Sequence, residues 1–574
     1  MWIEDLTDDK LRNSFANLRN PNEQISSIEK ATSNSLRLAG KARDITDWLI
    51  GINLTVAATK KYGNSDIRSK LLTTGRVQTA TLNMVVQRER AILGFKKTTF
   101  WKLTAIFSSP KGKFEAVYEQ GNFTEEAAAQ AALSECNGKN GVVTTVEVKH
   151  KTEAAPLLYN TTQLQIACSK KFGWSADKTQ KVMQKLYEAH LMSYPRTSSE
   201  HLTEAMIPEV KHTIELLLQM PEYAHYIIPE WAEFSRRHFD DSKVGSHTAV
   251  IPTESVPKDL KGLSEDEIKL YDLLARSLIK IIYPKAEFDD TTAKIAVDKH
   301  TFKATGKCIT NQGWYAVDGK PEAKELPPLS EGQELQAEYK ITEGETEPPK
   351  RYTEAELLAA MELAGQKLED EEARTLMKLQ KRGLGTDATR GPILKSLFDK
   401  EYLVKKGKSI YPTELGMYLI KCLPVKELKS AAYTGELEKQ LNNIALGKAS
   451  YDKYIAFIKK KTAEWYKLIA ESEDSKFTSS TEQQLICPFC GKPLIKLDWG
   501  YSCTGYKDGC KFHVNKKIAG KSITENQVIM LCKSGRTAII KGFKAKSGST
   551  FDAYLAVDKE KQEVSFQFPE RRKK

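Results

Sequence analysis

The spacing of large apolar residues along the chain changes from helical to strand-like and back again. Across residues 34–61 these side chains recur at turn-like intervals, which predicts an amphipathic helix. Apolar and polar residues then alternate over residues 101–107, and residues 114–120 and 142–149 are similar. Because a period of two is typical of strands, we expect a β segment to follow the first helical one.

Helical spacing returns from Ser175 to about Ile282, and a second β pattern comes after it. Its strands are expected at residues 291–297, 301–305, 314–317 and 335–341. A loop rich in Glu, Gly and Pro then leads to helices from Thr353 to about Ala470. Two β segments that flank a helical insert indicate one sheet domain that the chain leaves and re-enters.

Length and composition place the chain among multidomain globular proteins. Its 574 residues exceed what one compact core usually holds, and 40% hydrophobic with 28% charged residues is typical of globular proteins. No run approaches the roughly 18 apolar residues of a membrane span, and the first ten residues lack the apolar core of a signal peptide. We therefore expect a cytoplasmic protein without a membrane partner. The net charge of +12 favours a polyanionic partner, above all nucleic acid, although many basic proteins bind none.

The segment LMSYPRTS, residues 191–198, places a tyrosine and an arginine two positions apart between two expected helices. Pro195 disfavours helical angles at Tyr194, so the tyrosine is expected to be extended beyond the helix end. Residues 197–200, TSSE, match a capping box, and the helix that it begins would offer amide donors near Arg196. A phenol beside a guanidinium suits attack on a phosphodiester. The alternative is an ordinary surface turn.

This segment resembles the nucleophile motif of type IA DNA topoisomerases, in which an arginine follows the tyrosine two positions later. Further segments resemble motifs of that family and occur in the same order. They are DWLIGIN at 47–53, TGRVQT at 74–79, SHTAVIPT at 246–253, PPKRYTE at 348–354 and GLGTDATR at 383–390. The first of these favours the topoisomerase III branch. The shared order over so much of the chain makes coincidence implausible.

The resemblance implies a catalytic set of Tyr194, Arg196 and His247. Tyr194 would be the nucleophile that forms a 5′-phosphotyrosine link with one DNA strand. Arg196 would hold a non-bridging phosphate oxygen by charge-assisted hydrogen bonds. His247 would donate a hydrogen bond to the scissile phosphate.

The resemblance also implies DNA contacts by Arg76, Gln78 and Arg390. Arg76 and Gln78 follow a glycine, so their donors would reach a sugar-phosphate backbone at close approach. The alternative for Arg76 is a salt bridge. Arg390 follows a Gly-x-Gly-Thr turn, where it either touches DNA or pins the turn.

Four of the nine cysteines are close together near the C-terminus, and the remainder are isolated. The group consists of Cys487, Cys490, Cys503 and Cys510. Four thiolates at this spacing suit a closed, structural Zn²⁺ site, and His513 is a candidate substitute ligand. We expect Trp499, Tyr501 and Phe512 to form the small core of the ribbon. Incidental reduced cysteines are the alternative.

The lysine-rich segment beyond the ribbon resembles the small repeat that follows it in topoisomerase III-like enzymes. A short helix is expected from Ile523. Phe543 and Tyr554 would stack on bases while lysines such as Lys544 meet phosphates. The alternative is that the aromatic residues are core and the lysines form a solvated face.

Type IA enzymes normally begin with a Toprim domain, which contributes a catalytic glutamate and lysine and an Asp-x-Asp pair for Mg²⁺. Residues 2–8 resemble the segment that follows this domain, and the acidic pairs at 8–9, 240–241 and 289–290 lack the Asp-x-Asp context. Cleavage needs an acid to protonate the leaving 3′ oxygen, and resealing favours a metal ion. We therefore expect a separate Toprim-containing polypeptide, or loss of that domain by truncation.

The resemblance implies a multidomain α+β fold: a type IA toroid of helical domains and a β-rich arch, with a C-terminal zinc ribbon and repeat. The expected parts, in chain order, are base helices at 1–95, arch at 96–160, gate at 161–285, arch at 286–350, winged-helix-like base at 351–470, linker at 471–482, zinc ribbon at 483–518 and repeat at 519–574.

The expected function is a DNA topoisomerase that passes a strand through a transient single-strand break in single-stranded or negatively supercoiled DNA. No Gly-x4-Gly-Lys-Ser/Thr loop is found in the sequence, so ATP is not expected to take part. The alternative is a non-catalytic single-stranded DNA-binding protein that retains the fold. Tyrosine recombinases and relaxases fit poorly, because their His-hydrophobe-His and Arg/His sets are missing from the sequence.

Overall fold

The computed structural model describes residues 27–63, 71–227, 234, 236–364, 383–473, 485–497, 499–545, 547–558 and 563–568. The chain divides into two compact units, residues 1–476 and 477–574. None of the helices in the described ranges combines the length and the apolar character needed to cross a lipid bilayer.

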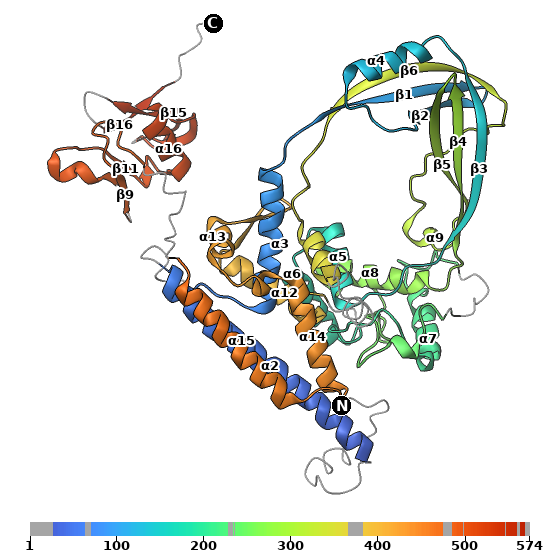
Figure 1. Cartoon of the computed structure of the whole chain (residues 1–574), viewed down its shortest axis with the longest axis horizontal. Helices are drawn as coiled ribbons and strands as arrows, with labels where there is room; N and C mark the ends of the chain where they lie inside the picture. The colour runs from blue at the N-terminus through green and yellow to red at the C-terminus, as the bar shows by residue number, and fades with distance from the viewer. Residues whose placement is uncertain are drawn as a thin grey trace. The chain divides into compact units, whose positions relative to one another are not determined.

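Six antiparallel strands of the first unit form a closed barrel in the order β1-β2-β5-β4-β3-β6 (Figure 1). The strands are β1 Thr99–Ser109, β2 Gly112–Tyr118, β3 Gly141–Glu153, β4 Ala286–Val297, β5 His300–Asn311 and β6 Glu334–Glu345. The chain leaves this barrel after β3 and returns to it with β4. The expected sheet domain with a helical insert is therefore confirmed.

Alternating side chains of these strands fill the barrel core. Leu103, Ala105 and Phe107 of β1 are fully buried, whereas Ile106 between them is 39% exposed. Helix α4, Glu126–Cys136, adds Ala132 and Cys136 to the same core. The period of two read from the sequence reflects this one-sided burial.

The insert between β3 and β4 is a helical subdomain with its own core. Its helices are α5 Thr161–Phe172, α6 Ala176–Glu188, η1 Glu204–Met206, α7 Ile207–Leu217, η2 Asp241–Lys243 and α8 Glu265–Lys280. The side chains of Asn160 and Ser175 accept from the amides of Gln163 and Lys178, so caps fix the starts of α5 and α6. Ser264 forms a complete capping box with Glu267 at the start of α8.

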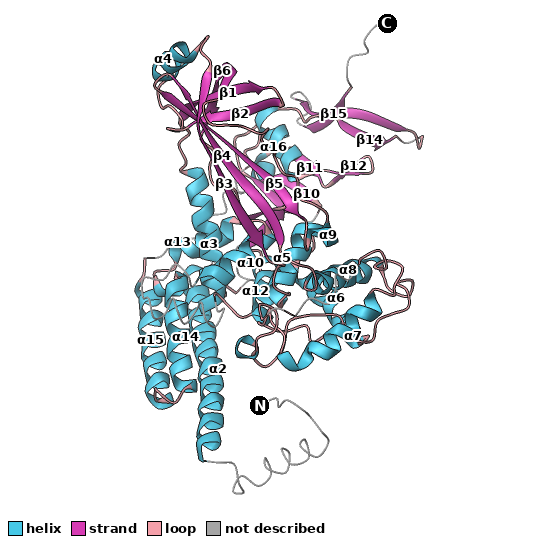
Figure 2. Ribbon diagram, turned by 90° about the vertical axis from the view of Figure 1, so that its right-hand side faces the viewer, coloured by secondary structure: helices cyan, strands magenta, loops and turns pink. Residues whose placement is uncertain are grey.

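Helices from both ends of the first unit pack together. Long helix α2, Ser27–Tyr62, lies beside α14, Ala431–Ala445, and α15, Tyr451–Glu471 (Figure 2). Helix α3, Arg76–Leu93, contacts α12, α13 and α14. The remaining elements of this region are α10 Glu354–Leu363, α12 Asp387–Asp399, β7 Leu403–Lys406, β8 Ser409–Pro412, α13 Glu414–Cys422 and η4 Glu427–Lys429.

The second unit is a small mixed domain in which the cysteine cluster and the repeat share one core. Its elements are β9 Leu494–Leu497, β10 Gly500–Cys503, η5 Thr504–Asp508, β11 His513–Asn515, β12 Lys517–Ile518, β13 Lys521–Ser522, α16 Glu525–Ser534, β14 Ile540–Lys544, β15 Thr550–Asp558 and β16 Glu563–Gln567. Cys487, Cys503 and Cys510 pack in one cluster with Val528 and Phe543. The expected helix after Ile523 is confirmed as α16.

Two sequence-based expectations about secondary structure were wrong. The strand expected at 314–317 is a single helical turn, α9 Tyr315–Asp318, because Trp314 and Tyr315 both turn into a small core with Ala155 and Ala286. No helix begins at Thr197: the chain is irregular from there to η1. The expected N-terminal segment at 2–8 and most of the linker lie outside the described residues.

Candidate active site

Tyr194 lies on the irregular segment between α6 and η1, with 36% of its surface exposed. Its ring is 4.4 Å from the His247 ring, centroid to centroid, at an interplanar angle of 35°. Tyr187 from α6 meets it edge-on at 5.5 Å. The structure therefore brings together the tyrosine and the histidine that the sequence analysis linked.

Exposed and buried side chains alternate along this loop. Tyr194 and Arg196 are exposed, whereas Pro195 and Thr197 are buried. Among the described residues, Arg196 has no hydrogen-bond or ion-pair partner. Its guanidinium is thus available for an anion.

The segment that carries His247 holds the loop on one side. Ser193 donates its amide to the Ile251 carbonyl at 2.9 Å, and its hydroxyl donates to the Ala249 carbonyl at 3.1 Å. The Thr197 hydroxyl donates to the carbonyl of His247 itself at 3.2 Å. These bonds fix the position of Tyr194 relative to His247 through the backbone.

The first turn of α5 holds the loop on the other side. The Thr161 hydroxyl lies 2.8 Å from the Pro195 carbonyl oxygen and 3.1 Å from that of Thr197. It accepts the Thr197 amide at 2.9 Å, and the Thr161 amide donates to the Thr197 carbonyl at 3.1 Å. The helix N-terminus beside the loop is therefore that of α5. This corrects the expectation of a helix that starts at Thr197, whose hydroxyl is used for loop contacts instead.

Arg390 is fully buried in α12 and anchors the turn that precedes it. Its Nη1 donates to the Asp387 carboxylate at 3.0 Å and to the Thr162 hydroxyl at 2.8 Å, and Nε donates to the Leu384 carbonyl. Gly385 in this turn has φ +73°, a conformation that favours glycine. Of the two roles left open for Arg390, the geometry favours pinning the turn.

Sequence reasoning missed Thr161 and Thr162, which connect the Tyr194 loop to α12. Both side chains are fully buried, and Thr162 donates to Asp387 at 2.6 Å. The signal available in the sequence was a pair of adjacent hydroxyls directly after a good N-cap, Asn160. Nothing local indicated that one hydroxyl would meet the Tyr194 loop and the other α12.

Glu362 of α10 lies at the contact between α10 and α5. Gln163 of α5 donates to Glu362 of α10 at 2.6 Å. Burial raises the pKa of Glu362, the positive charge of Arg390 opposes this rise, and the negative charges of Asp387 and Glu200 add to it. Glu362 therefore loses its proton less readily than an exposed glutamate while these groups are in contact.

Arg76 takes part in a buried ion-pair network. Its guanidinium donates to Asp47 at 2.6 Å and to Glu438 at 2.7 Å, while Arg43 also binds Glu438. These carboxylates raise the pKa of Arg76 against the opposing effect of burial. The salt bridge considered for Arg76 is thus present.

A cavity of about 310 Å³ lies beside this network. Arg76, Gln78, Asp47, Thr386 and Thr389 are among the residues that line it. Gln78 donates to the Thr73 hydroxyl at 3.0 Å. The TGRVQT and GLGTDATR motifs, far apart in the sequence, therefore face one hollow.

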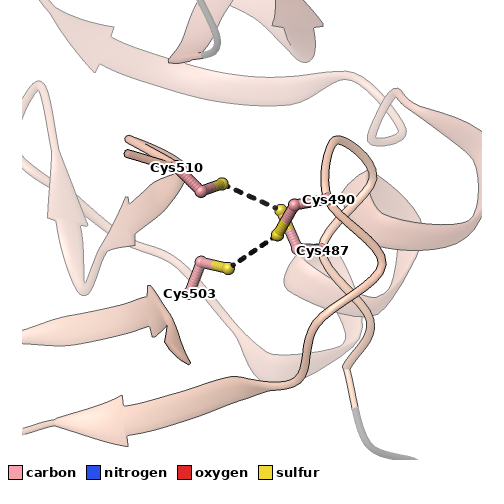
Figure 3. Close-up of side chains that lie close together, drawn as sticks. All are labelled: Cys487, Cys490, Cys503 and Cys510. Atoms are coloured by element: carbon pink, nitrogen blue, oxygen red, sulfur yellow. Dashed lines mark hydrogen bonds between the residues drawn. The ribbon is translucent and has the colours of Figure 1, made fainter. Parts of the chain in front are cut away.

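The four cysteines form a compact sulfur cluster. Their ligand atoms all lie within 4.8 Å of one another, and Figure 3 shows the sulfur atoms turned toward one centre. Sγ of Cys487 is 3.5 Å from that of Cys510, and Sγ of Cys490 is 3.2 Å from that of Cys503. The bond from the Lys492 amide, followed by the Cys503 contact, lowers the pKa of Cys490 to about 7. This donor set fits a tetrahedral Zn²⁺ site.

The surroundings of the cluster correct two expectations about aromatic residues, those for Trp499 and Phe543. Tyr501 and Phe512 are buried, but Trp499 is 48% exposed and meets the ring of His513 edge-on. Phe543 is fully buried, so it is a core residue rather than a base-stacking one. Tyr554 is half-buried under Arg536, whose guanidinium carbon is 4.6 Å from the ring centre. Lys544 is exposed on β14.

A closed barrel that the chain leaves and re-enters, with a tyrosine loop on the helical insert, is the fold of type IA DNA topoisomerases. The chain belongs to this family: residues 31–456 match the family described as DNA topoisomerase. Residues 509–569 match the family described as the C-terminal repeat of topoisomerase, which begins just before Cys510. The expected fold class is thereby confirmed.

The chain is similar to enzymes named DNA topoisomerase 3. It is 35% identical to that of Bacillus licheniformis over 512 residues, which cover 87% of this chain and 68% of the relative. It is 34% identical to that of Bacillus subtilis over 522 residues, with the same coverage. Full-length topoisomerase I from Thermotoga maritima has the same fold, with a TM-score of 0.59 and 23% identity over 84% of this chain and 77% of that one.

Proposed function

We propose that this chain cuts and reseals one DNA strand through Tyr194 and passes another strand through the break. One observation carries the proposal. In a chain of the topoisomerase family, the ring of the exposed Tyr194 lies 4.4 Å from the ring of His247, centroid to centroid. Arg196 follows two residues later and has no bonding partner among the described residues. The activity is that of an isomerase that needs no ATP, because supercoiling supplies the energy.

The chemistry of the loop is phosphoryl transfer to a phenol. The Tyr194 oxygen attacks phosphorus and loses its proton, and the bond to the 3′ oxygen breaks to leave a 5′-phosphotyrosine. Arg196 stabilises the negative charge on the non-bridging oxygens. His247 donates a hydrogen bond to the same phosphate. Cleavage replaces the bond from phosphorus to the 3′ oxygen by a bond to the tyrosine oxygen. Resealing is the reverse exchange and needs no further source of energy.

The acid that protonates the leaving 3′ oxygen, and the ligands for Mg²⁺, come from a Toprim domain outside the described residues. Within the described ranges, the cluster able to hold a metal ion is the four cysteines, and Mg²⁺ requires oxygen ligands. Asp240 is engaged by Lys243 and Ser242, and Asp289 and Asp290 bind His150 and Lys151 on the barrel. We assign no step to these acidic pairs.

Single-stranded or negatively supercoiled DNA is the proposed substrate. Arg76 and Gln78 line the cavity shared with the 383–389 turn, where phosphate oxygens would compete with Asp47 and Glu438 for the guanidinium. Arg390 would act on DNA through the turn that it anchors. Lys544 would add a phosphate contact in the second unit. Zn²⁺ held by the four cysteines would stabilise that unit and take no part in the reaction.

Trapping of the covalent intermediate tests the proposal. The chain is incubated with a labelled single-stranded oligonucleotide, denatured and digested, and a 5′-phosphotyrosyl peptide that contains Tyr194 is expected. Tyr194→Phe should abolish the adduct and leave binding of the oligonucleotide intact. Salt-sensitive binding with no adduct, even after addition of a Toprim-containing partner, would instead favour the non-catalytic DNA-binding function.

Relaxation of negatively supercoiled plasmid tests the origin of the acid. With Mg²⁺ and this chain alone, little relaxation is expected. Robust relaxation by the chain alone would refute the proposal that the acid lies on another polypeptide or segment.

A further inference from the structure

The hydroxyl of Thr161 bonds the backbone on both sides of Arg196. A hydroxyl has one proton and two lone pairs, and here the proton points to the carbonyls of Pro195 and Thr197 while a lone pair accepts the Thr197 amide. Thr161 is fully buried, so water cannot replace these bonds. This side chain therefore holds the backbone that presents Tyr194 and Arg196 on the α5 side, in addition to the bonds that Ser193 and Thr197 make to the segment of His247.

Thr162, the next residue, bonds to α12 instead of to the Tyr194 loop. Its hydroxyl donates to Asp387 at 2.6 Å and accepts from Arg390 at 2.8 Å. Because Thr161 and Thr162 are adjacent in the first turn of α5, their side chains point in different directions around the helix. One turn of helix thus contacts the Tyr194 loop with one hydroxyl and α12 with the other.

We propose that Thr161 is a positioning residue for the nucleophile and that the Thr161–Thr162 turn links the placement of Tyr194 to the contact between the helical insert and α12. The inference rests on the proposed function, since it concerns the geometry of Tyr194 and Arg196 during transfer. If α5 separates from α12, Thr162 loses its bonds to Asp387 and Arg390. Thr161, in the same helical turn, makes the bonds that hold the Tyr194 loop.

The chain offers a conservative rescue and a matched control for the test. Thr161→Val keeps the shape and removes the hydroxyl, whereas Thr161→Ser keeps the hydroxyl. Thr213 of α7 is also buried, but within the described part of the chain its hydroxyl bonds only the Glu209 carbonyl of its own helix. Thr213→Val therefore makes the same change in the same subdomain away from the loop.

The first measurement is the rate at which the full chain forms the adduct with a single-stranded oligonucleotide. If the wild type needs a Toprim-containing partner to react, the same partner is added to every variant. At saturating oligonucleotide we expect Thr161→Val to be slower by about 10- to 100-fold, the loss that a misplacement of about 1 Å causes. The half-saturating concentration should stay nearly unchanged. Thr161→Ser and Thr213→Val should react at rates close to wild type. Equal losses in Thr161→Val and Thr213→Val, or a loss only in binding, would overturn the proposal.

The second measurement is amide hydrogen exchange of residues 193–199, which needs no activity. Thr161→Val should exchange the Thr197 amide about tenfold faster or more, because its acceptor is gone, and Thr161→Ser should not. Unchanged exchange in Thr161→Val would refute the positioning role. A wild-type chain that forms no adduct under any condition would refute the proposed function, while the exchange result would still decide whether Thr161 holds the loop.

Discussion

Burial alternates along the Tyr194 loop although the loop belongs to no strand. Pro195 and Thr197 are buried, and Thr161 bonds the backbone of both. Their neighbours Tyr194 and Arg196 therefore face outward. A mobile loop would lose conformational freedom each time that DNA bound. Here that cost is met during folding, and the two exposed side chains are left for the phosphate.

Replacement of Arg196 should slow transfer far more than it weakens DNA binding. We expect Arg196→Ala to lower the rate of adduct formation at saturating oligonucleotide by about 10²- to 10³-fold, the usual loss for one donor to a developing oxyanion. Arg196→Lys should recover part of it, since an ammonium keeps the charge but not the fork of donors. Exposed Arg236→Ala is the control and should change only salt-dependent affinity. Similar losses for both arginines would argue against a role of Arg196 at the phosphate.

The raised pKa of Glu362 predicts a pH dependence of stability. A carboxyl whose folded pKa exceeds its unfolded value binds its proton more tightly when folded. Its contribution is thus fully present below the unfolded pKa and is lost as pH rises through the folded pKa. Glu362→Gln, which mimics the protonated form, should therefore gain stability relative to wild type as pH rises from about 4 toward neutrality, by about 1.4 kcal/mol per pKa unit of the shift. Urea unfolding at several pH values measures this, with Glu322→Gln, at an exposed glutamate, as the control.

At the scale of elements, buried polar groups join α5 and α12. Thr162, Asp387 and Arg390 form a connected set, and Glu362 approaches it through Gln163. Nη2 of Arg390 is buried without a partner among the described residues. A buried ion pair of this kind needs a well-defined geometry to offset the cost of removing its charges from water.

Asp387→Asn should destabilise the contact between α5 and α12. It leaves the Arg390 guanidinium buried beside a neutral partner, which costs about 3–5 kcal/mol in comparable buried pairs. Asp399→Asn, at the exposed Lys395–Asp399 pair of the same helix, should cost less than about 1 kcal/mol. Amide exchange of α5 and α12 during a urea titration would separate the two effects. Equal costs would mean that the buried set does not hold the contact.

The sequence predicted the elements whose signals are local. Alternation in β1 and the cap at Ser175 are properties of a few neighbouring residues, and the structure has both. Thr197-Ser198-Ser199-Glu200 also looked like a local signal, but long-range partners at Thr161 and His247 took the hydroxyls and amides that a helix start would use. The strand prediction for residues 314–317 was wrong for a similar reason. Their aromatic side chains fill a core that exists only once β3 and β4 have paired.

The parts of the candidate site that the family resemblance linked could be predicted from the sequence. The parts that only tertiary contacts bring together could not. Tyr194 and His247 were linked in advance, and their rings are in contact. Thr161 and Thr162 carry no special chemistry in the sequence, and their role follows only from the 2.6–3.1 Å bonds that they make to segments distant in the chain. Whether Arg76 meets DNA depends on a competition with Asp47 and Glu438 that the sequence does not reveal.

At the scale of the whole molecule, the two units have different sources of stability. The first has large apolar cores in its barrel and helical insert. The second has one small core in which three of the four cysteines are members, together with Val528, Leu531 and Phe543 of the repeat. A small domain of this kind usually needs a metal ion or disulfides in addition to its apolar contacts.

Removal of Zn²⁺ should therefore unfold the ribbon and the repeat together and leave the first unit folded. Structural zinc contributes about 10–16 kcal/mol in small metal-dependent domains, more than so small a core can replace. Metal analysis of the purified chain should find one zinc per chain. After chelation, amide exchange should become rapid in α16 and β14–β16 but not in the barrel. Cys503→Ser should act like chelation, whereas Cys308→Ser, at an exposed cysteine of the barrel, should leave the zinc content unchanged. Continued protection of α16 in the metal-free chain would mean that the repeat folds without the ribbon, despite their shared core.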